Sequence, residues 1–457
     1  MKGIIMKKSM AYLISPGTVW AQTVKVNGFK TIVEGCDWGP ALSKIVLDMG
    51  QMIKATYVNK GEFSVQVVRK HFGSGEIVKP MNWETMTTYE SRGELKVVDA
   101  YLSDAAGTKT STASGKFIAL VLDVGPDINL GSTIDFDPET FLNRFVDVQT
   151  TVVIKGGLTA PDTIVPPSAK TGTITPIADD FDTKGVCAYQ DDKYGAITLH
   201  YASYTPKSVE DGNKHPLIIW LHGAGEGGSD PFLVLLGNRL TQLAQDPIQE
   251  IMGGAYVLVP QSPIVWMNNG VESYPEDGST QYTKALKACI DAYIAKTPNV
   301  DTKRVYIGGC SNGGFMTVDM ILNYPDFFAT AFPACEAYAD RWISDTQIAA
   351  IKNVPIWFTQ AKPDTTVKAA EGGYVIETYK RLISAGAKNA HLSYWDKVED
   401  LSGKYFKADG KTPYEYNGHW SWVYTLNNLC TKDFDGSAVK VNGKDSTIFE
   451  WIAAQSK

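Results

Sequence analysis

Residues 309–313 read Gly-Cys-Ser-Asn-Gly and carry the clearest chemical signal in the chain. An apolar run at 304–308 precedes them and a helical pattern at 314–323 follows, so Ser311 stands on a turn between a strand and a helix. The flanking glycines remove side chains that would collide on so tight a turn, which leaves the serine oxygen projecting above the sheet. The helix adds the positive end of its dipole nearby. We therefore interpret Ser311 as a nucleophile.

A serine hydroxyl is a weak nucleophile until a histidine, itself oriented by a carboxylate, takes its proton. Asp364 follows the apolar run at 354–359, and the carboxyl ends of such strands are where sites in open α/β sheets collect. His419 lies further on, in a loop that precedes a helical stretch. The order serine, acid, histidine is the one expected for a nucleophile on this kind of turn. We predict a triad of Ser311, Asp364 and His419.

Other residues could fill two of these roles. Asp396 and Asp400 are reserve acids, because the orienting carboxylate follows different strands in different hydrolases. Asp364 would then be a surface turn residue after its proline. His391 begins a predicted buried strand, where we favour a structural role over that of a base.

The negative charge of a tetrahedral intermediate needs preorganised N–H donors. The backbone of Asn312, directly after the serine, offers one donor, and Ala224 or Gly225 in the glycine-rich segment 221–228 offers another. We expect His222, in the same segment, to be structural. The segment lacks the glycine spacing of a dinucleotide site and the lysine of a phosphate-binding loop, so it does not predict nucleotide binding.

These residues must be positioned by a scaffold, and the second half of the chain has the sequence pattern of an α/β domain. Apolar strand-like runs alternate with helical stretches, which predicts a doubly wound, mostly parallel sheet with helices on both faces. The domain is expected over residues 178–457. Its predicted strands are 216–221, 255–260, 304–308, 355–359 and 391–395, and its predicted helices are 282–294, 314–323 and 373–385.

The first part of the chain differs from the second. Short β-branched runs separated by turn residues extend over 23–157 and predict an all-β sandwich. Residues 158–177 are polar and contain prolines at 161, 166 and 167 as well as 176, which is typical of an extended linker. We expect the sandwich to contribute no catalytic group and to mediate subunit contacts or lie over the site.

Composition excludes several classes of function. The 457 residues sum to a net charge of −7 without a dense basic block, which argues against binding nucleic acid or anionic membranes. The sequence contains no run of eighteen apolar residues, so no membrane span is expected. Six cysteines without a C-x-x-C pair exclude a zinc ribbon. If residues 1–21 are a signal peptide, the protein is secreted or periplasmic; otherwise it is cytoplasmic.

The second half resembles α/β hydrolases of the esterase branch that includes polyhydroxybutyrate-depolymerase-like and feruloyl-esterase-like enzymes and relatives of prolyl oligopeptidases. The segments 222–228, 259–263, 309–314 and 418–420 carry this resemblance. The first half, with Asp-Trp-Gly-Pro-Ala at 37–41, is similar to the immunoglobulin-like domain in front of the EstA type of bacterial esterase. The resemblance implies hydrolysis of carboxylic esters by the predicted triad, without metal or cofactor. Lys362 and Ser262 depart from the usual pattern of these relatives.

We therefore expect a serine esterase acting through an acyl-enzyme. A peptidase of the prolyl-oligopeptidase type uses the same machinery, and a noncatalytic carbohydrate-binding or adhesion protein is a further alternative. The expected substrate is a short-chain or aryl (cinnamoyl) ester, either small or attached to a polymer, and the sandwich is a candidate for homo-oligomer contacts. Aromatic side chains near the site could stack on such a group. The predicted substrate-binding residues are Trp266, Trp420 and Trp422, with Tyr414 and Tyr416 close by.

Overall fold

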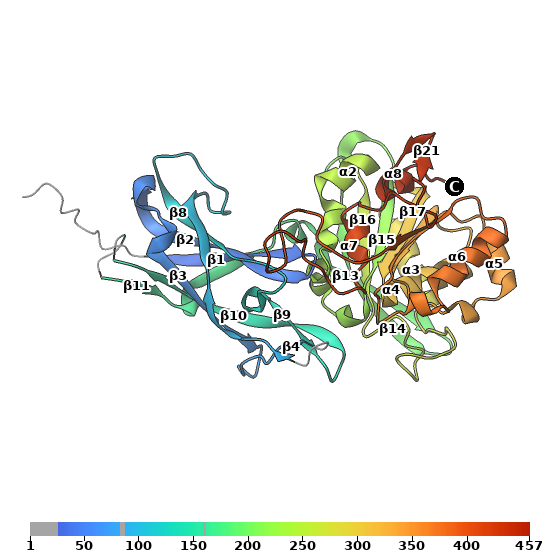
Figure 1. Cartoon of the computed structure of the whole chain (residues 1–457), viewed down its shortest axis with the longest axis horizontal. Helices are drawn as coiled ribbons and strands as arrows, with labels where there is room; N and C mark the ends of the chain where they lie inside the picture. The colour runs from blue at the N-terminus through green and yellow to red at the C-terminus, as the bar shows by residue number, and fades with distance from the viewer. Residues whose placement is uncertain (1–25, 83–86, 157, 159–160) are drawn as a thin grey trace, which may run out of the picture.

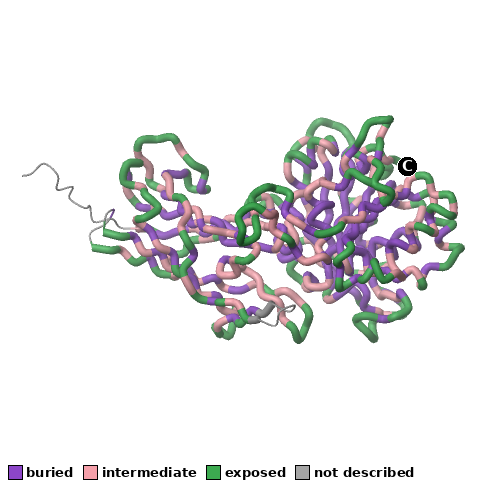
Figure 2. The backbone as a smooth tube through the Cα atoms, viewed as in Figure 1, coloured by how far each residue is buried: buried purple, intermediate pink, exposed green. Residues whose placement is uncertain are grey.

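The computed structural model describes residues 26–82, 87–156, 158 and 161–457 and divides them into two domains, a strand-rich one and a larger α/β one (Figure 1). Each domain has its own buried interior (Figure 2). The candidate signal peptide at 1–21 and the first predicted strand residues, 23–25, lie outside the described residues. Among the described residues, no helix is both long and apolar enough to cross a membrane.

The N-terminal domain is a sandwich of two sheets. The first has the order β12-β1-β2-β8-β7, and the second has the order β11-β10-β3-β6 with β9 beside β10. The strands of the first sheet are β1 (Gly28–Cys36), β2 (Gly39–Lys54), β7 (Val97–Ser103), β8 (Ser114–Leu122) and β12 (Lys170–Ile174). Those of the second are β3 (Phe63–His71), β6 (Arg92–Leu95), β9 (Ile134–Asp137), β10 (Leu142–Ile154) and β11 (Thr163–Val165); β4 (Met81–Asn82) pairs with β5 (Thr87–Thr88).

Period-two alternation explains why these segments form a sandwich. In β3, Phe63, Val65 and Val67 are buried, whereas the residues between them are less so. They pack with Ile45 and Leu120 of the other sheet in one hydrophobic core. A strand whose alternate side chains are apolar buries one face and leaves the other to solvent. Consecutive strands can belong to different sheets: β6 ends at Leu95 and β7 begins at Val97, and the two lie on opposite sides of the sandwich.

The segment 158–177 is not the linker predicted from its prolines. Its residues form β11, antiparallel to β10, and β12, parallel to β1. Both are edge strands, and the prolines at 166 and 167 stand in the connection between them, where no ladder hydrogen bond is lost. The sandwich therefore extends to Ile174 and is closed by the residues that immediately precede the second domain.

The C-terminal domain contains an eight-stranded sheet of order β13-β14-β16-β15-β17-β18-β19-β20. The pairs β13–β14 and β14–β16 are antiparallel, and the remaining pairs are parallel. The strands are β13 (Asp182–Asp191), β14 (Gly195–Tyr204), β15 (His215–Leu221), β16 (Tyr256–Gln261), β17 (Val300–Cys310), β18 (Thr330–Ala334), β19 (Ile356–Ala361) and β20 (Ala390–Trp395). A short pair, β21 (Lys440–Val441) and β22 (Lys444–Asp445), lies apart from it.

Helices cover both faces of this sheet. Alternate residues of β15 enter different cores: Leu217 and Ile219 pack on one side and Ile218 and Trp220 on the other. One face is covered by α3 (Thr283–Lys296), α4 (Asn312–Asn323), α5 (Asp345–Ile351) and α6 (Val375–Ser384). The other is covered by α1 (Pro231–Gly237), α2 (Asp246–Met252), α7 (Trp422–Leu426) and α8 (Ile448–Ala453). Burial on both sides explains the nearly continuous apolar runs of the central strands.

The two domains meet around the turn between β1 and β2. Asp37 accepts a hydrogen bond from Asn427 (2.9 Å) and pairs with Arg239 (3.4 Å), both of the C-terminal domain. Beside it, Trp38 packs edge-on against Tyr405, with ring centroids 4.6 Å apart. The N-terminal domain is thus held against the C-terminal domain by a buried, partnered carboxylate and an aromatic pair.

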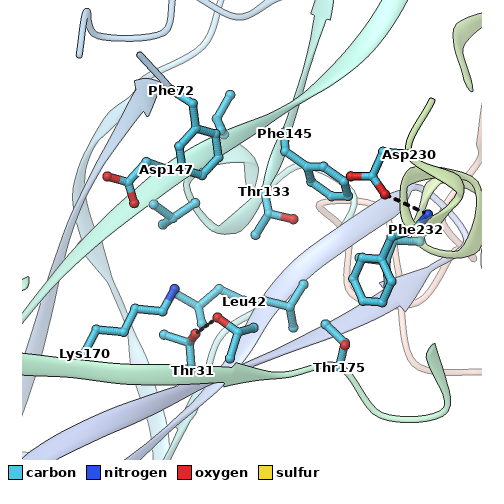
Figure 3. Close-up of a pocket in the computed structure, with 15 residues that line it drawn as sticks. Thr31, Leu42, Phe72, Thr133, Phe145, Asp147, Lys170, Thr175, Asp230 and Phe232 are labelled. Atoms are coloured by element: carbon cyan, nitrogen blue, oxygen red, sulfur yellow. Dashed lines mark hydrogen bonds between the residues drawn. The ribbon is translucent and has the colours of Figure 1, made fainter. Parts of the chain in front are cut away.

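A cavity of about 350 Å³ also lies between the domains, on the α1 side (Figure 3). Phe72 and Phe145 of the N-terminal domain line it together with Phe232 and Leu236 of α1. Its lining residues do not include the predicted triad.

Candidate active site

Ser311 occupies the sharp turn between β17 and α4. Its backbone has φ 55° and ψ −115°, a conformation that non-glycine residues rarely adopt. Its N–H donates to the carbonyl of Ala334 (2.9 Å), and its own carbonyl accepts from Phe315 (2.9 Å). The surrounding backbone therefore holds the strained residue at the carboxyl edge of the sheet.

The glycines beside Ser311 are required by space. A Cβ at Gly309 would lie 2.6 Å from the carbonyl oxygen of Gly313, and a Cβ at Gly313 would lie 2.0 Å from that of Leu221. Both distances are far shorter than any real contact, and the opposing atoms are backbone. The turn packs so closely against β15 that no larger residue fits.

Gly313→Ala is expected to lower the free energy of unfolding by more than about 4 kcal/mol, because the added methyl group must displace backbone of the central sheet. Chemical denaturation, or soluble yield if the variant does not fold, measures the effect. Gly172→Ala is the matched control, since a Cβ there meets nothing within 4 Å. Equal stability of the two variants would contradict this account of the turn.

The structure brings Ser311, His419 and Asp364 together. His419 Nε2 lies 2.8 Å from Ser311 Oγ, and His419 Nδ1 lies 2.8 Å from Asp364 Oδ2. Asp364 follows β19, as predicted, and is 4% exposed; His419, in the loop before α7, is 9% exposed. This geometry is that of a base within reach of a hydroxyl and oriented by a carboxylate.

The Asp364 carboxylate is itself fixed. Its Oδ1 accepts the backbone N–H groups of Thr366 (2.9 Å) and Val367 (2.8 Å), and Gln360 donates to Oδ2 (3.2 Å). These donors leave Oδ2 aimed at the imidazole. Charge-assisted hydrogen bonds of this kind fix the position of a buried carboxylate.

The alternative residues are engaged elsewhere. Asp396 is exposed and pairs with Lys362, and Asp400 accepts hydrogen bonds from Ser402 (2.8 Å). His391 Nδ1 lies 2.7 Å from Asp433, and its ring packs against Trp357. These contacts describe a structural histidine and two carboxylates with partners of their own.

His222 lies in the core beneath the glycine-rich segment. Its Nδ1 is 2.6 Å from the carbonyl of Gly223, and its Nε2 accepts the N–H of Ser262 (3.1 Å). Burial lowers the pKa of His222 to about 4, so the ring stays neutral. A neutral ring with its proton on Nδ1 donates to the Gly223 carbonyl and accepts from the Ser262 N–H. The residue connects the segment to the end of β16.

The glycine-rich segment is held by a buried acid that the sequence analysis did not single out. The Glu226 carboxylate accepts the N–H of Gly223 (3.0 Å) and the amide of Asn238 (2.7 Å). Its side chain folds back over the short 3₁₀ turn η7 (Ala224–Glu226). Glutamate three residues after a helix-capping position is the sequence signal that could have identified it. Glu226 thereby fixes the backbone that carries Ala224 and Gly225.

We expect Glu226→Gln to flatten the pH dependence of stability. Burial raises the pKa of Glu226 to about 8 from its usual 4.5. The folded state therefore binds this proton more tightly than the unfolded chain, and the resulting stability is complete below pH 4.5 and is lost as the pH rises through about 8. Glutamine keeps an acceptor for Gly223 and cannot ionise.

Thermal unfolding at pH 5, 7 and 9 measures this effect. The wild type should lose several degrees of melting temperature more than Glu226→Gln between the first and last pH, on the order expected for a change of a few kcal/mol. Glu250→Gln, at an exposed position of the same domain, is the control. Parallel pH profiles for wild type and Glu226→Gln would refute the assignment.

Ser311 and His419 open into a cavity of about 600 Å³ with a mainly nonpolar lining. Ala224 and Gly225 line it, as do Trp420 and Trp422. Asn312 begins α4 directly behind Ser311, and its side chain accepts the N–H of Trp266 (2.5 Å). The residues predicted to donate to an oxyanion thus border the cavity or the nucleophile.

Trp266 does not take the predicted place beside a substrate. Its side chain is 0% exposed and packs against His222 and Tyr282, with ring centroids 5.1 and 5.8 Å away. A side chain without exposed surface cannot contact a ligand in this conformation. Its position in the sequence, shortly after β16, is compatible with either a loop or a core residue, and burial decides between them.

Tyr414 and Tyr416 line a neighbouring cavity of about 790 Å³. This cavity shares Trp38 and Trp420 with the one that contains Ser311. Residues of the N-terminal domain line both cavities, in line with the expectation that this domain could lie over the site, although the sequence analysis named none of these residues. No local pattern marks such residues, because they meet the site only through the packing of the two domains.

Comparisons with known proteins place both halves of the chain. Residues 28–166 match the family described as the esterase Ig-like N-terminal domain. Residues 268–370, which include Ser311 and Asp364, match the prolyl oligopeptidase family. No protein of curated function matches the chain by sequence.

One solved structure extends these matches to nearly the whole chain. The crystal structure of a thermostable esterase is 24% identical, with a TM-score of 0.69 over 94% of this chain and 100% of that one. A ferulic acid esterase (15% identity, TM-score 0.38) covers 54% of this chain and 95% of its own. An S-formylglutathione hydrolase from Agrobacterium tumefaciens is 14% identical, with a TM-score of 0.37 over 54% of this chain and 92% of its own. The chain therefore has the two-domain fold of an Ig-like domain followed by a hydrolase domain.

Proposed function

We propose that the chain is a serine carboxylesterase that hydrolyses carboxylic esters through an acyl-enzyme. The observation that carries this proposal is the hydrogen-bonded series from Asp364 through His419 to Ser311, with 2.8 Å at each step, at the wall of a mainly nonpolar cavity. The match of residues 28–166 to an esterase domain supports the same class of reaction.

Ser311 Oγ attacks the ester carbonyl carbon while His419 Nε2 takes the hydroxyl proton. Asp364 stabilises the imidazolium, and the N–H groups of Asn312 and of Ala224 or Gly225 receive the oxyanion. The bond to the alcohol then breaks, and His419 returns its proton to the leaving oxygen. Water, deprotonated by the same imidazole, attacks the acyl-enzyme and releases the acid, and Ser311 regains its proton.

The cavity favours nonpolar acyl or alcohol groups. Trp420 and Trp422 offer aromatic surface for a short-chain, aryl or cinnamoyl ester. The adjoining cavity with Tyr414 and Tyr416 provides room for a larger attached group, such as part of a polymer. The N-terminal domain remains our candidate for contacts between subunits, which light scattering of the full chain would measure.

A second candidate function is that of a serine peptidase, favoured by the match of residues 268–370 to the prolyl oligopeptidase family. Rates on p-nitrophenyl butyrate, methyl ferulate and a peptide p-nitroanilide separate the two. We expect ester turnover to exceed peptide turnover by a wide margin. The reverse order would establish the peptidase instead.

A fluorophosphonate probe tests the nucleophile independently of substrate choice. We expect one adduct, located on Ser311 by mass spectrometry of the digested protein. A chain that neither forms this adduct nor hydrolyses any ester would be noncatalytic, and the proposal would be abandoned in favour of a binding or adhesion protein.

A further inference from the structure

The cavity that contains Ser311 is completed by the other domain. Its N-terminal-domain wall comes from the β9–β10 hairpin and from the β1–β2 turn, opposite the glycine-rich segment, Ser311 and His419. The hairpin residues that line it are Ile134, Phe136, Pro138, Phe141 and Asn143. These side chains are nonpolar except for one amide. The wall therefore adds nonpolar surface to a cavity whose floor carries the reactive groups.

The hairpin is firmly built. Asp137 pairs with Leu142 in the ladder, and its carboxylate accepts hydrogen bonds from the N–H of Glu139 (3.0 Å) and the hydroxyl of Thr140 (2.8 Å). The same carboxylate pairs with Arg144. Such a network fixes the turn, and with it the directions of the side chains on either side.

Arg69 anchors the hairpin to the sandwich. Its buried guanidinium donates to the carbonyls of Ser132 (2.9 Å) and Ile134 (2.6 Å), at the start of β9. On the other strand, the amide of Asn143 lies against the glycine-rich segment: a Cβ placed on Gly225 would be 3.0 Å from Asn143 Nδ2. The hairpin thus joins the sandwich core to the predicted oxyanion backbone.

Phe141 is an unusual residue at the tip. Its φ is 59°, a left-handed conformation that is energetically unfavourable for a bulky residue. The residue is 58% exposed, and its ring meets that of Phe136 edge-on with ring centroids 6.0 Å apart. The strained backbone at Phe141 destabilises the folded protein, and the exposed ring gains no burial that would offset this cost. Contact with a ligand would supply the burial that the fold does not.

We propose that the β9–β10 hairpin of the N-terminal domain determines ester specificity, with Phe136 and Phe141 contacting the nonpolar group of the substrate. The proposal rests on the esterase function proposed above and extends it to a residue set outside the hydrolase domain. The chemistry recognised is a hydrocarbon or aryl group, which an ester can carry on its acyl or on its alcohol side.

Phe136→Ala and Phe141→Ala test the proposal in the full chain. Phe141→Asn is a second variant that removes the ring with a residue suited to positive φ, so the turn keeps its shape. Phe72→Ala is the matched control: it removes another exposed phenylalanine of the same domain, from the cavity of Figure 3. Two substrate series, p-nitrophenyl esters of acetate, butyrate and octanoate and acetates of ethanol, butanol and octanol, vary the two sides of the ester separately.

In at least one series, kcat/KM for the longest relative to the shortest member should fall about 10-fold in Phe136→Ala, Phe141→Ala and Phe141→Asn, and stay at the wild-type ratio in Phe72→Ala. A methylene in a nonpolar site is worth roughly 10-fold or more in discrimination. The responding series shows which side of the ester contacts the hairpin. Unchanged ratios in both series, with an active wild type, would overturn the hairpin proposal alone. A wild type that hydrolyses no ester and leaves Ser311 unlabelled would overturn the esterase function itself.

Discussion

Ser311→Ala is expected to lower kcat for ester hydrolysis by about 10⁴- to 10⁶-fold while the protein stays folded. Removing the nucleophile of a triad leaves only the contributions of substrate binding and the oxyanion donors. The rest of the turn is unaffected, because its hydrogen bonds to Ala334 and Phe315 involve only the backbone.

Stopped assays on p-nitrophenyl butyrate, together with thermal unfolding, measure the two halves of this prediction. Ser437→Ala, at an exposed serine of the same domain, is the control and should retain wild-type turnover. Ser311→Ala, unlike Ser437→Ala, should also fail to form the fluorophosphonate adduct. Ester turnover in folded Ser311→Ala within 10-fold of wild type would assign the nucleophile to another residue.

Asp364→Asn is expected to lower kcat by about 10⁴-fold, the scale known for this change in a serine triad. Asparagine can keep its oxygen on the N–H groups of Thr366 and Val367, so its amino group faces His419 Nδ1. Nδ1 must then act as an acceptor, which places the ring proton on Nε2. In that tautomer Nε2 cannot take the proton of Ser311.

The comparison with Asp396→Asn makes this prediction specific. Asp396 is the exposed reserve acid that pairs with Lys362, and its amide variant should keep wild-type turnover. The rate of fluorophosphonate labelling should fall in parallel with kcat in Asp364→Asn only. If Asp396→Asn lost activity instead, the orienting carboxylate would be Asp396, which follows β20, and not Asp364, which follows β19.

The predicted triad could be located from sequence because its signals are local. Ser311 is marked by a five-residue pattern between a strand and a helix, and Asp364 by its place after an apolar run. Each signal depends on neighbours within one turn or strand. The structure adds their mutual distances, which follow from the parallel order of β17, β18 and β19.

Features that depend on long-range packing could not be predicted in the same way. β12 pairs with β1 across most of the N-terminal domain, and its own residues are polar and follow two prolines, so composition indicated a linker. Phe141 lines a cavity that the two domains form together, and nothing in its neighbourhood in the sequence indicates this position. The burial of Trp266 likewise depends on side chains from distant segments.

The parallel pairing of β12 with β1 has a consequence for folding during synthesis. Thr31 and Thr173, whose hydroxyls are 3.0 Å apart, are separated by 142 positions. At roughly 5–20 residues per second, the ribosome needs on the order of ten seconds to add the strand that closes the first sheet. Until then, the outer edge of β1 offers unpaired backbone groups to other nascent chains.

The hydrolase domain follows β12 in the chain, so every strand of the sandwich is synthesised before it. The β9–β10 hairpin and the rest of the sandwich therefore precede β17 and the turn that carries Ser311 in the order of synthesis. We expect shortened chains that end before Lys170 to aggregate through the open edge of β1 more readily than chains that end after Ile174.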